Sequence, residues 1–391
     1  LEAYIIFKTI FSNLFKLSYR VLFIMKIDLK KSPEYYFMIL VMFSAYFSVS
    51  ALTINPVYII GFSVVLLSFL YLKVDKVDKF YLFYLFYFFV SLCGFFLGLY
   101  FFEVKAKDQV VYLSSILYLY CILLGSAVII FGSKFGQDLR IAVYKNVYDA
   151  LIIFMGVDLI SRIAMAANNG NFYDYKWGVF YFDSNFTGTI ILLFLIFSIY
   201  LKENKIFDIG MGRFLILVFL LLGTFSRAAI FSFVLTYFLF RYSRKFINIL
   251  AFLFSIFAFY FFNKLVSLYL SGESFSNIDG SFNSKFYLIS VAIDNYSNLS
   301  NLNKIFGIGL ANFPYFSDGL FAHNIVITFF YEFGFWGIAW FLVFLTVSYF
   351  KIGKDVLYIF IPFSIVSFSL FSAYMPFFFV LVACMYVEKK Y

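Results

Sequence analysis

The chain has 391 residues, of which 64% are hydrophobic and 13% are charged, and its formal net charge is +9. A soluble domain needs roughly 25% charged residues to cover its surface, so this composition excludes a soluble protein and indicates an integral membrane protein. The positive charge does not predict nucleic-acid binding. The basic residues form small clusters between apolar segments and are not interleaved with aromatic residues in a polar segment.

Residues 1–34 are predicted to be a cytoplasmic leader before the membrane-spanning part of the chain. Four polar residues recur at every fourth position and form one stripe on a helix: Lys8, Ser12, Lys16 and Arg20. This stripe predicts an amphipathic helix that lies on the inner membrane surface. Because Met25 opens a plausible start, we interpret residues 1–24 as a leader or as a misassigned start.

Apolar segments follow one another along the rest of the chain, most at lengths near the ~17–25 residues that a membrane-spanning helix needs. Residues 35–270 hold nine of them, and residues 324–391 hold three more and a cytoplasmic tail. Their approximate limits are 35–54, 56–72, 80–102, 109–132, 147–167, 184–201, 213–225, 226–240, 247–270, 324–350, 356–373 and 375–387. The sequence therefore predicts an all-α polytopic membrane protein with about twelve transmembrane helices. Residues 271–323, before the tenth helix, are predicted to form one long loop with a helical part around 285–295.

The basic residues predict on which side of the membrane each connection lies. With a cytoplasmic N-terminus, 22 of the 30 Lys and Arg residues fall in cytoplasmic segments. The other eight are Lys105, Lys107, Arg162, Lys176, Arg227, Lys264, Lys285 and Lys304. This asymmetry predicts that both termini are cytoplasmic and that the loop 271–323 lies outside.

Charged residues at membrane depth are candidate functional residues, because each is costly to bury without a partner. Arg227 is predicted at the outer tip of a helical hairpin, where it either reaches to the membrane surface or binds an anion such as phosphate. Arg162 follows Asp158 by four residues, which fits either an intrahelical ion pair or a second anion contact. Lys285, in the outer loop, is either an ordinary surface lysine or a further anion contact.

His323 is the single histidine of the chain, and it lies where the outer loop is predicted to re-enter the membrane. A neutral imidazole accepts a proton near neutral pH, so His323 is a candidate general base. We predict no metal or cofactor, because the histidine has no neighbouring ligands, and no Asp-x-Asp pair or phosphate-binding Gly-rich loop is present. The three cysteines lie inside apolar segments without metal-ligand spacing: Cys93, Cys121 and Cys384.

Several short motifs resemble those of the O-antigen polymerase and O-antigen ligase superfamily. Gly223-Thr224-Phe225-Ser226-Arg227-Ala228-Ala229 resembles its Ser-Arg-small motif, and Asp183-Ser184-Asn185 resembles its short Asn motif at the start of a membrane helix. Its outer-loop signature is Gly-x-Gly, then His-Asn, then Glu-x-Gly-x-x-Gly. The similar residues are Gly307-Ile308-Gly309, His323-Asn324 and Glu332-Phe333-Gly334-Phe335-Trp336-Gly337.

The resemblance implies a metal-independent glycosyltransferase on the periplasmic face of a bacterial inner membrane. By position, it implies that His323 is the base and that Arg227 contacts the diphosphate of an undecaprenyl-diphosphate-linked glycan. The remaining motif residues and cations are candidate substrate contacts: Arg162, Lys285, Asn324, Ser226, Asn185 and Glu332. The family often has Arg upstream of the Gly-x-Gly where this chain has Lys285, which keeps the charge and loses the two-pronged geometry.

We favour a polymerase that joins lipid-linked O-antigen repeats, with undecaprenyl-diphosphate-linked glycans as donor and acceptor. Membrane lipid is an expected partner, and a chain-length regulator is a candidate one. The alternative within the family is an O-antigen ligase, which transfers the glycan to the lipid A core. The alternative from another class is a lipid-linked oligosaccharide flippase. A flippase needs cations along a cavity open to both sides, whereas the cations predicted at membrane depth here are all outer-sided.

Overall fold

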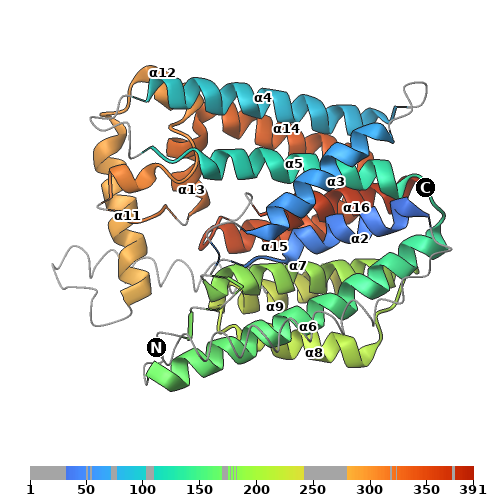
Figure 1. Cartoon of the computed structure of the whole chain (residues 1–391). Helices are drawn as coiled ribbons and strands as arrows, with labels where there is room; N and C mark the ends of the chain where they lie inside the picture. Colours follow the sequence, from blue (N-terminus) through green and yellow to red (C-terminus); the bar gives the residue numbers. More distant parts are fainter. Residues whose placement is uncertain are drawn as a thin grey trace.

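The computed structural model describes residues 32–49, 52, 55–71, 77–102, 110–169, 175–176, 178, 180–181, 183–241, 280–317, 319–322, 324–371 and 375–391. These residues form helices and turns, and no strand occurs among them (Figure 1). The predicted leader helix in residues 1–24 and the predicted span 247–270 lie outside the described residues.

Helices occupy the other apolar segments that were predicted to span the membrane. In the described part of the chain, the first eight of these are α2 (Pro33–Tyr46), α3 (Pro56–Leu70), α4 (Lys79–Phe101), α5 (Leu113–Gly132), α6 (Gln137–Asn169), α7 (Ser184–Glu203), α8 (Met211–Gly223) and α9 (Arg227–Arg241). The helix α11 (Gly280–Tyr296) lies within the predicted outer loop. They are followed by α12 (Asn301–Phe306), η5 (Phe313–Tyr315), α13 (Ile325–Ile327), the π-helical η6 (Thr328–Phe333), α14 (Gly334–Ile352), η7 (Lys354–Val356), α15 (Leu357–Ser367) and α16 (Phe377–Lys390).

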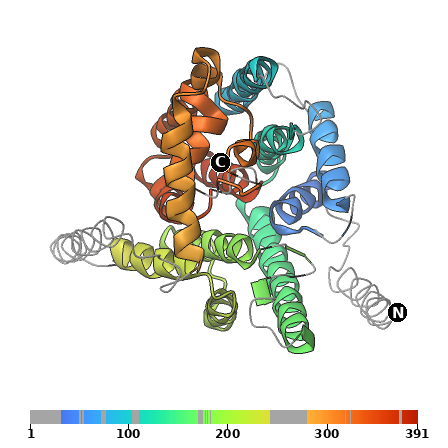
Figure 2. The ribbon, with the colours of Figure 1, turned by 90° about the vertical axis from the view of Figure 1, so that its left-hand side faces the viewer.

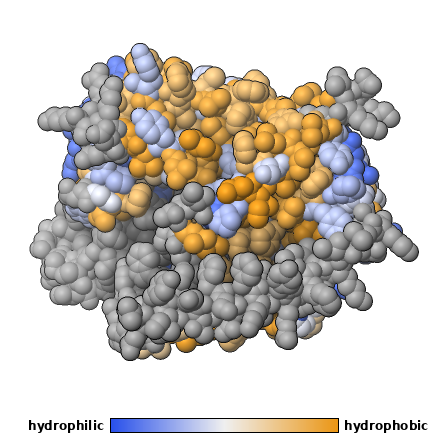
Figure 3. Space-filling view, viewed as in Figure 1, coloured by the Kyte–Doolittle hydropathy of each residue, from blue (hydrophilic) through white to orange (hydrophobic). Residues whose placement is uncertain are grey.

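Five helical segments of the described chain are long and apolar enough to cross a membrane: α4, α5, α6, α7 and the continuous segment from α13 through α14. Apolar side chains cover the middle of the face seen in Figure 3, and hydrophilic side chains gather toward its two sides. The helices run between these two sides (Figure 1). The prediction of a helical membrane protein is therefore confirmed.

Several helices begin where a polar side chain satisfies the first backbone amides, as the sequence permits. Asp78 accepts the amide hydrogens of Phe80 at 2.6 Å and Tyr81 at 3.3 Å. Asp183 accepts from Asn185 at 2.9 Å, and Asn324 accepts from Val326 at 2.8 Å. Such caps stabilise a helix start by about 1 kcal/mol each. They place the starts of α4, α7 and α13 at defined residues.

The core of the bundle contains α5 and α16, which pack against each other. From Phe377 to Val387, every residue of α16 is buried, and the C-terminal end of the chain projects onto the middle of the bundle in Figure 2. Some tyrosine hydroxyls inside the core are paired: the oxygens of Tyr87 and Tyr118 lie 2.6 Å apart, and Tyr84 donates to the Phe379 carbonyl at 3.0 Å. An apolar helix thus serves as the buried centre of the bundle.

At one end of the bundle, α11 lies across the ends of the other helices (Figures 1 and 2). We call this the α11 end. The segment around 285–295 that was predicted to be helical belongs to α11. The starts of α7, α9 and α13 lie at the same end, because alternate helices run in opposite directions (Figure 1). The described residues of the motifs at the starts of α7, α9 and α13 therefore lie at the α11 end.

Candidate functional site

The Gly-x-Gly segment and the Glu-x-Gly segment are in direct backbone contact. The amide of Ile308 donates to the Tyr331 carbonyl at 2.9 Å, and the amide of Gly309 donates to the Glu332 carbonyl at 3.1 Å. A Cβ atom on Gly307 would lie 2.2 Å from the Glu332 carbonyl oxygen, and one on Gly334 would lie 2.3 Å from the Gly307 nitrogen. Only glycine allows the two backbones to approach this closely.

Glu332 uses its carboxylate within the protein. The side chain is 4% exposed, and Oε1 accepts the amide hydrogen of Phe313 at 3.3 Å. The amides of Ala311 and Asn312 also hydrogen-bond to this carboxylate. Glu332 was expected to contact substrate, and the structure places it instead beneath the turn after Gly309. In this structure Glu332 stabilises the outer loop by accepting hydrogen bonds from its backbone amides.

Two asparagines that sequence reasoning did not select fasten this loop to the bundle. The Asn303 side chain donates to the carbonyls of Gly98 at 3.1 Å and Gly307 at 3.0 Å. The Asn312 side chain accepts the Val111 amide at 2.7 Å and donates to the Val111 carbonyl at 3.0 Å. The available signal was their place beside the Gly-x-Gly motif, since asparagine often bonds to nearby backbone in turns.

The two motifs at the starts of α7 and α9 meet through side chains. Ser226 donates its hydroxyl hydrogen to Asn185 Oδ1 at 3.0 Å. The Asn185 amide group donates to the Asp183 carboxylate at 3.0 Å. Gly188 allows the two helices to approach, because a Cβ atom there would lie 2.7 Å from Ser226 Cβ. Asn185 and Ser226 thus form one polar cluster with the α7 cap.

Arg227 is the first residue of α9, at the tip of the hairpin formed by α8 and α9. Phe225, two residues before Arg227, has a positive φ of 51°, which turns the chain sharply between the two helices. The Arg227 side chain is exposed, whereas its neighbour Ser226 is 2% exposed. The hairpin tip was the predicted position of this arginine.

Arg162 forms the intrahelical ion pair with Asp158 that the sequence left as one of two readings. Its Nε lies 2.7 Å from Asp158 Oδ2, and both side chains are 1% exposed. Its other two nitrogens donate to Thr187 Oγ1 and to backbone carbonyls of residues 175–181. All three guanidinium nitrogens therefore have acceptors within the protein. In this structure Arg162 uses them within the protein and not for the expected contact with substrate.

The remaining candidates are located more coarsely. His323 lies outside the described residues, between Ala322, which is buried, and Asn324. Asn324 caps α13 and donates to the Phe368 carbonyl at 2.9 Å, which ties the start of α13 to the end of α15. Lys285 lies on α11. In the described part of the chain, no three His, Cys, Asp or Glu residues are grouped to hold a metal ion.

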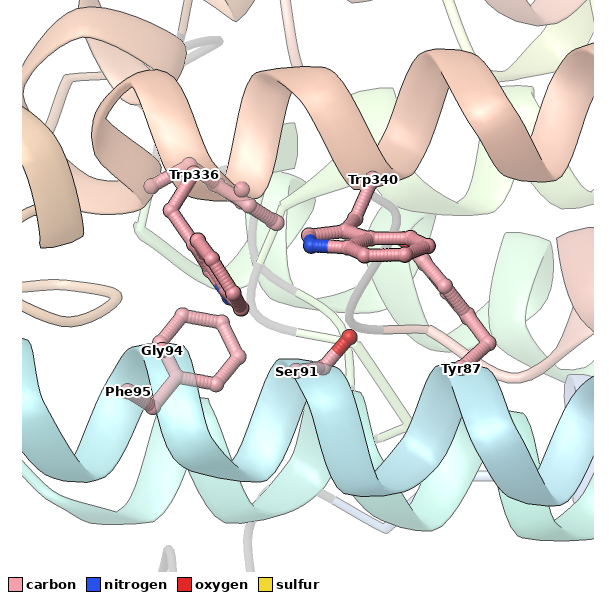
Figure 4. A pocket seen from close by; sticks show the side chains of 8 residues that line it. Tyr87, Ser91, Gly94, Phe95, Trp336 and Trp340 are labelled. Atoms are coloured by element: carbon pink, nitrogen blue, oxygen red, sulfur yellow. The ribbon is translucent and has the colours of Figure 1, made fainter.

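A small cavity between α4 and α14 is not a substrate site. Its volume is about 10 Å³, which is room for about one water molecule. Trp336 and Trp340 point from α14 toward Ser91 and Gly94 on α4 (Figure 4). Trp336 donates its indole hydrogen to the Val90 carbonyl at 3.0 Å. The cavity is a gap in aromatic packing between two helices.

The fold and its apolar helices define a helical membrane protein in which the Asn185–Ser226 contact and the contact between the Gly307 and Glu332 segments lie at the α11 end. Comparison of the chain with protein-family models, curated proteins and solved structures gives no match.

Proposed function

We propose that this protein is a membrane glycosyltransferase that joins lipid-diphosphate-linked glycan repeats into a surface polysaccharide of the O-antigen type. One observation carries the proposal: motifs far apart in the sequence meet in pairs at the same end of the bundle. Asn185 bonds to Ser226, and the segment at Gly307–Gly309 packs on the segment at Glu332–Gly334. These are four of the five segments on which the resemblance to the O-antigen polymerase and ligase superfamily rests, and the fifth is His323-Asn324.

The electrostatics of the α11 end suit a diphosphate. Arg227 stands at the N-terminus of α9, where the helix dipole adds partial positive charge to that of the guanidinium. Lys285 belongs to α11, which crosses this end of the bundle. A diphosphate leaves as an anion, so fixed positive charge stabilises the transition state, typically by ~3–4 kcal/mol per well-placed donor.

The chemistry assigns one further role. A sugar hydroxyl of the acceptor attacks the anomeric carbon of the donor, the bond to the diphosphate breaks, and the hydroxyl proton passes to a base. His323 is the proposed base, and Asn324 holds the chain beside it to the end of α15. The end of α15 leads back to the other motifs, because α15 packs against α7 and α9, whose starts carry Asn185 and Arg227.

The proposed setting is a bacterial inner membrane with about twelve spans, the α11 end in the periplasm and both termini in the cytoplasm. The opposite end supports this orientation, because basic residues gather where α7, α9, α14 and α16 end. These residues are Lys202, Arg241, Lys351, Lys389 and Lys390.

The test is deletion of the gene followed by electrophoresis of the surface polysaccharide. Loss of a polymerase leaves chains of a single repeat on the lipid A core. A core without repeats, together with accumulated lipid-linked polymer, would instead identify a ligase. Absence of any outward-facing repeat would identify a flippase. Unchanged surface polysaccharide would exclude the polymerase, ligase and flippase functions alike.

A further inference from the structure

The buried ion pair of α6 is connected to a segment that precedes α7. Arg162 donates from Nη2 to the Tyr181 carbonyl at 3.2 Å and to Thr187 Oγ1 at 3.0 Å, and from Nη1 to the Lys176 carbonyl. The Tyr175 carbonyl lies 3.5 Å from Nη1. One guanidinium thus contacts several backbone carbonyls of the segment before α7.

The segment packs directly on the ion pair. A Cβ atom on Gly178 would lie 2.6 Å from Asp158 Oδ1 and 3.0 Å from Arg162 Cζ. The Gly178 amide donates to the Tyr181 carbonyl at 3.0 Å, which links two parts of this segment beside the pair. The position of Tyr175 therefore depends on where the guanidinium is held.

Tyr175 extends this support to the hairpin tip that carries Arg227. Its hydroxyl donates to the Gly223 carbonyl at the end of α8. Its ring packs edge-on against Phe225, with ring centroids 5.1 Å apart, and Tyr175 is 7% exposed. Gly223 and Phe225 flank the turn that leads into Ser226 and Arg227.

We propose that Arg162 is a positioning residue that acts through Tyr175 to hold the α8–α9 turn, and with it Arg227, at the α11 end. Arg162 binds no ligand in this role. The carbonyl contacts require the planar fork of a guanidinium, which a lysine does not provide. The statement about activity rests on the proposed function, whereas the statement about the turn does not.

A nitroxide spin label on an Arg227→Cys variant, in a background without the native cysteines, reports the motion of the turn by its electron paramagnetic resonance line shape. Tyr175→Phe removes the hydroxyl contact and keeps the ring, so we expect the label to become more mobile. The matched control is Tyr148→Phe. Like Tyr175, Tyr148 donates its hydroxyl hydrogen to a backbone carbonyl. Its acceptor is the Phe194 carbonyl at 2.7 Å, which lies within the bundle. We expect no change in that variant.

A second comparison tests whether Arg162 acts through Tyr175. Arg162→Lys keeps a cation beside Asp158, so the protein is expected to insert and fold while the label gains mobility. Adding Tyr175→Phe to Arg162→Lys should then change little, because residues in one network are not additive. An unchanged line shape in Tyr175→Phe, an equal change in Tyr148→Phe, or additive effects would each overturn the proposal.

The activity arm uses unlabelled protein with native Arg227 and a lipid-linked repeat as substrate. Tyr175→Phe should lower kcat about 10-fold, since small misplacements of a transition-state contact cost this much or more, and should leave KM nearly unchanged. If the wild-type protein transfers no glycan, the proposed function fails, while the spin-label comparison still decides the positioning role.

Discussion

Arg227 combines exposure at the hairpin tip with a position at a helix N-terminus, which is the usual geometry for binding an anion. Replacement by alanine should abolish polymer formation. Replacement by lysine should retain part of it, because the charge stays and the two-pronged contact is lost. The matched control is Arg241→Ala at the other end of α9, whose side chain is also exposed. Polymer analysis by electrophoresis, with immunoblotting for protein level, measures both. Full activity of Arg227→Ala would contradict the anion-binding role. It would favour the alternative interpretation, in which the Arg227 side chain only reaches to the membrane surface.

His323 is the residue on which the proposed proton transfer depends. His323→Ala should insert normally and bind donor, because the diphosphate is held by cations, yet lose about 100-fold or more in turnover. The measurement is transfer of a purified lipid-linked repeat by purified protein in the presence of a chelator. Substantial turnover by the variant would assign the proton to water, because the alternative carboxylate, Glu332, is occupied by backbone amides.

At the scale of elements, the contact between the outer loop and the start of α14 depends on glycines. Gly307 has a φ of 78°, and a Cβ atom there would meet the backbone of Glu332 at 2.2 Å. Gly307 also has a ψ of −175°, a combination that essentially only glycine adopts. Gly307→Ala should therefore combine backbone strain of about 1–3 kcal/mol with a clash that separates the two segments. The result should be a lower unfolding temperature in detergent and faster proteolysis of the loop.

Gly319 provides the control for strain alone. It has a φ of 89°, and a Cβ atom there would meet nothing within 4 Å. Gly319→Ala should lower the unfolding temperature less than Gly307→Ala does. Equal effects of the two substitutions would show that the close approach of the backbones contributes nothing to stability.

At the scale of the whole molecule, the end opposite α11 is joined by charged side chains. Arg140 and Glu388 form a buried ion pair at 2.7 Å, which links α6 to α16. Asp78, at the start of α4, pairs with Lys390 at 2.5 Å and accepts from the hydroxyls of Tyr386 and Tyr391. These contacts fix the central helix to the helices around it.

Asp78 makes the stability of this end depend on pH. Burial raises its pKa, but hydrogen bonds from Lys390, Tyr391, the Phe80 amide and Tyr386 outweigh burial and lower the pKa below its ordinary value. A lowered pKa contributes stability above the unfolded value of about 3.9, and this contribution is lost as pH falls through the folded value. Asp78→Asn should therefore unfold at a lower temperature than wild type at pH 7, and the difference should shrink below about pH 4. A difference that is constant between pH 7 and pH 3 would contradict this assignment.

The orientation of the whole molecule is tested by reporter fusions. Fusions after Lys245 and Lys354 should report the cytoplasm, and fusions within residues 271–322 should report the periplasm. The reason is the excess of basic residues at the end opposite α11. A cytoplasmic signal from the 271–322 fusions would contradict the proposed periplasmic location of the site.

Sequence alone determined the class of the protein and the approximate place of most described helices, although α6 begins at Gln137 rather than near the predicted 147, and α2 ends at Tyr46 rather than near 54. Composition and apolar length are local properties, and so are helix caps such as Asp183 and Asn324. The sequence did not determine which side chain contacts which partner. Apolar helices are hydrophobic on every side, so their sequence does not indicate which face packs against a neighbour.

Tertiary structure decided those partnerships. It showed that Arg162 binds the 175–181 segment, that Glu332 accepts loop amides, and that α16 is the buried centre of the bundle. It also joined Asn185 to Ser226 across 41 positions of the sequence. The physical reason is that a buried polar group must find a hydrogen-bond partner, and which acceptor lies within reach depends on how the helices assemble.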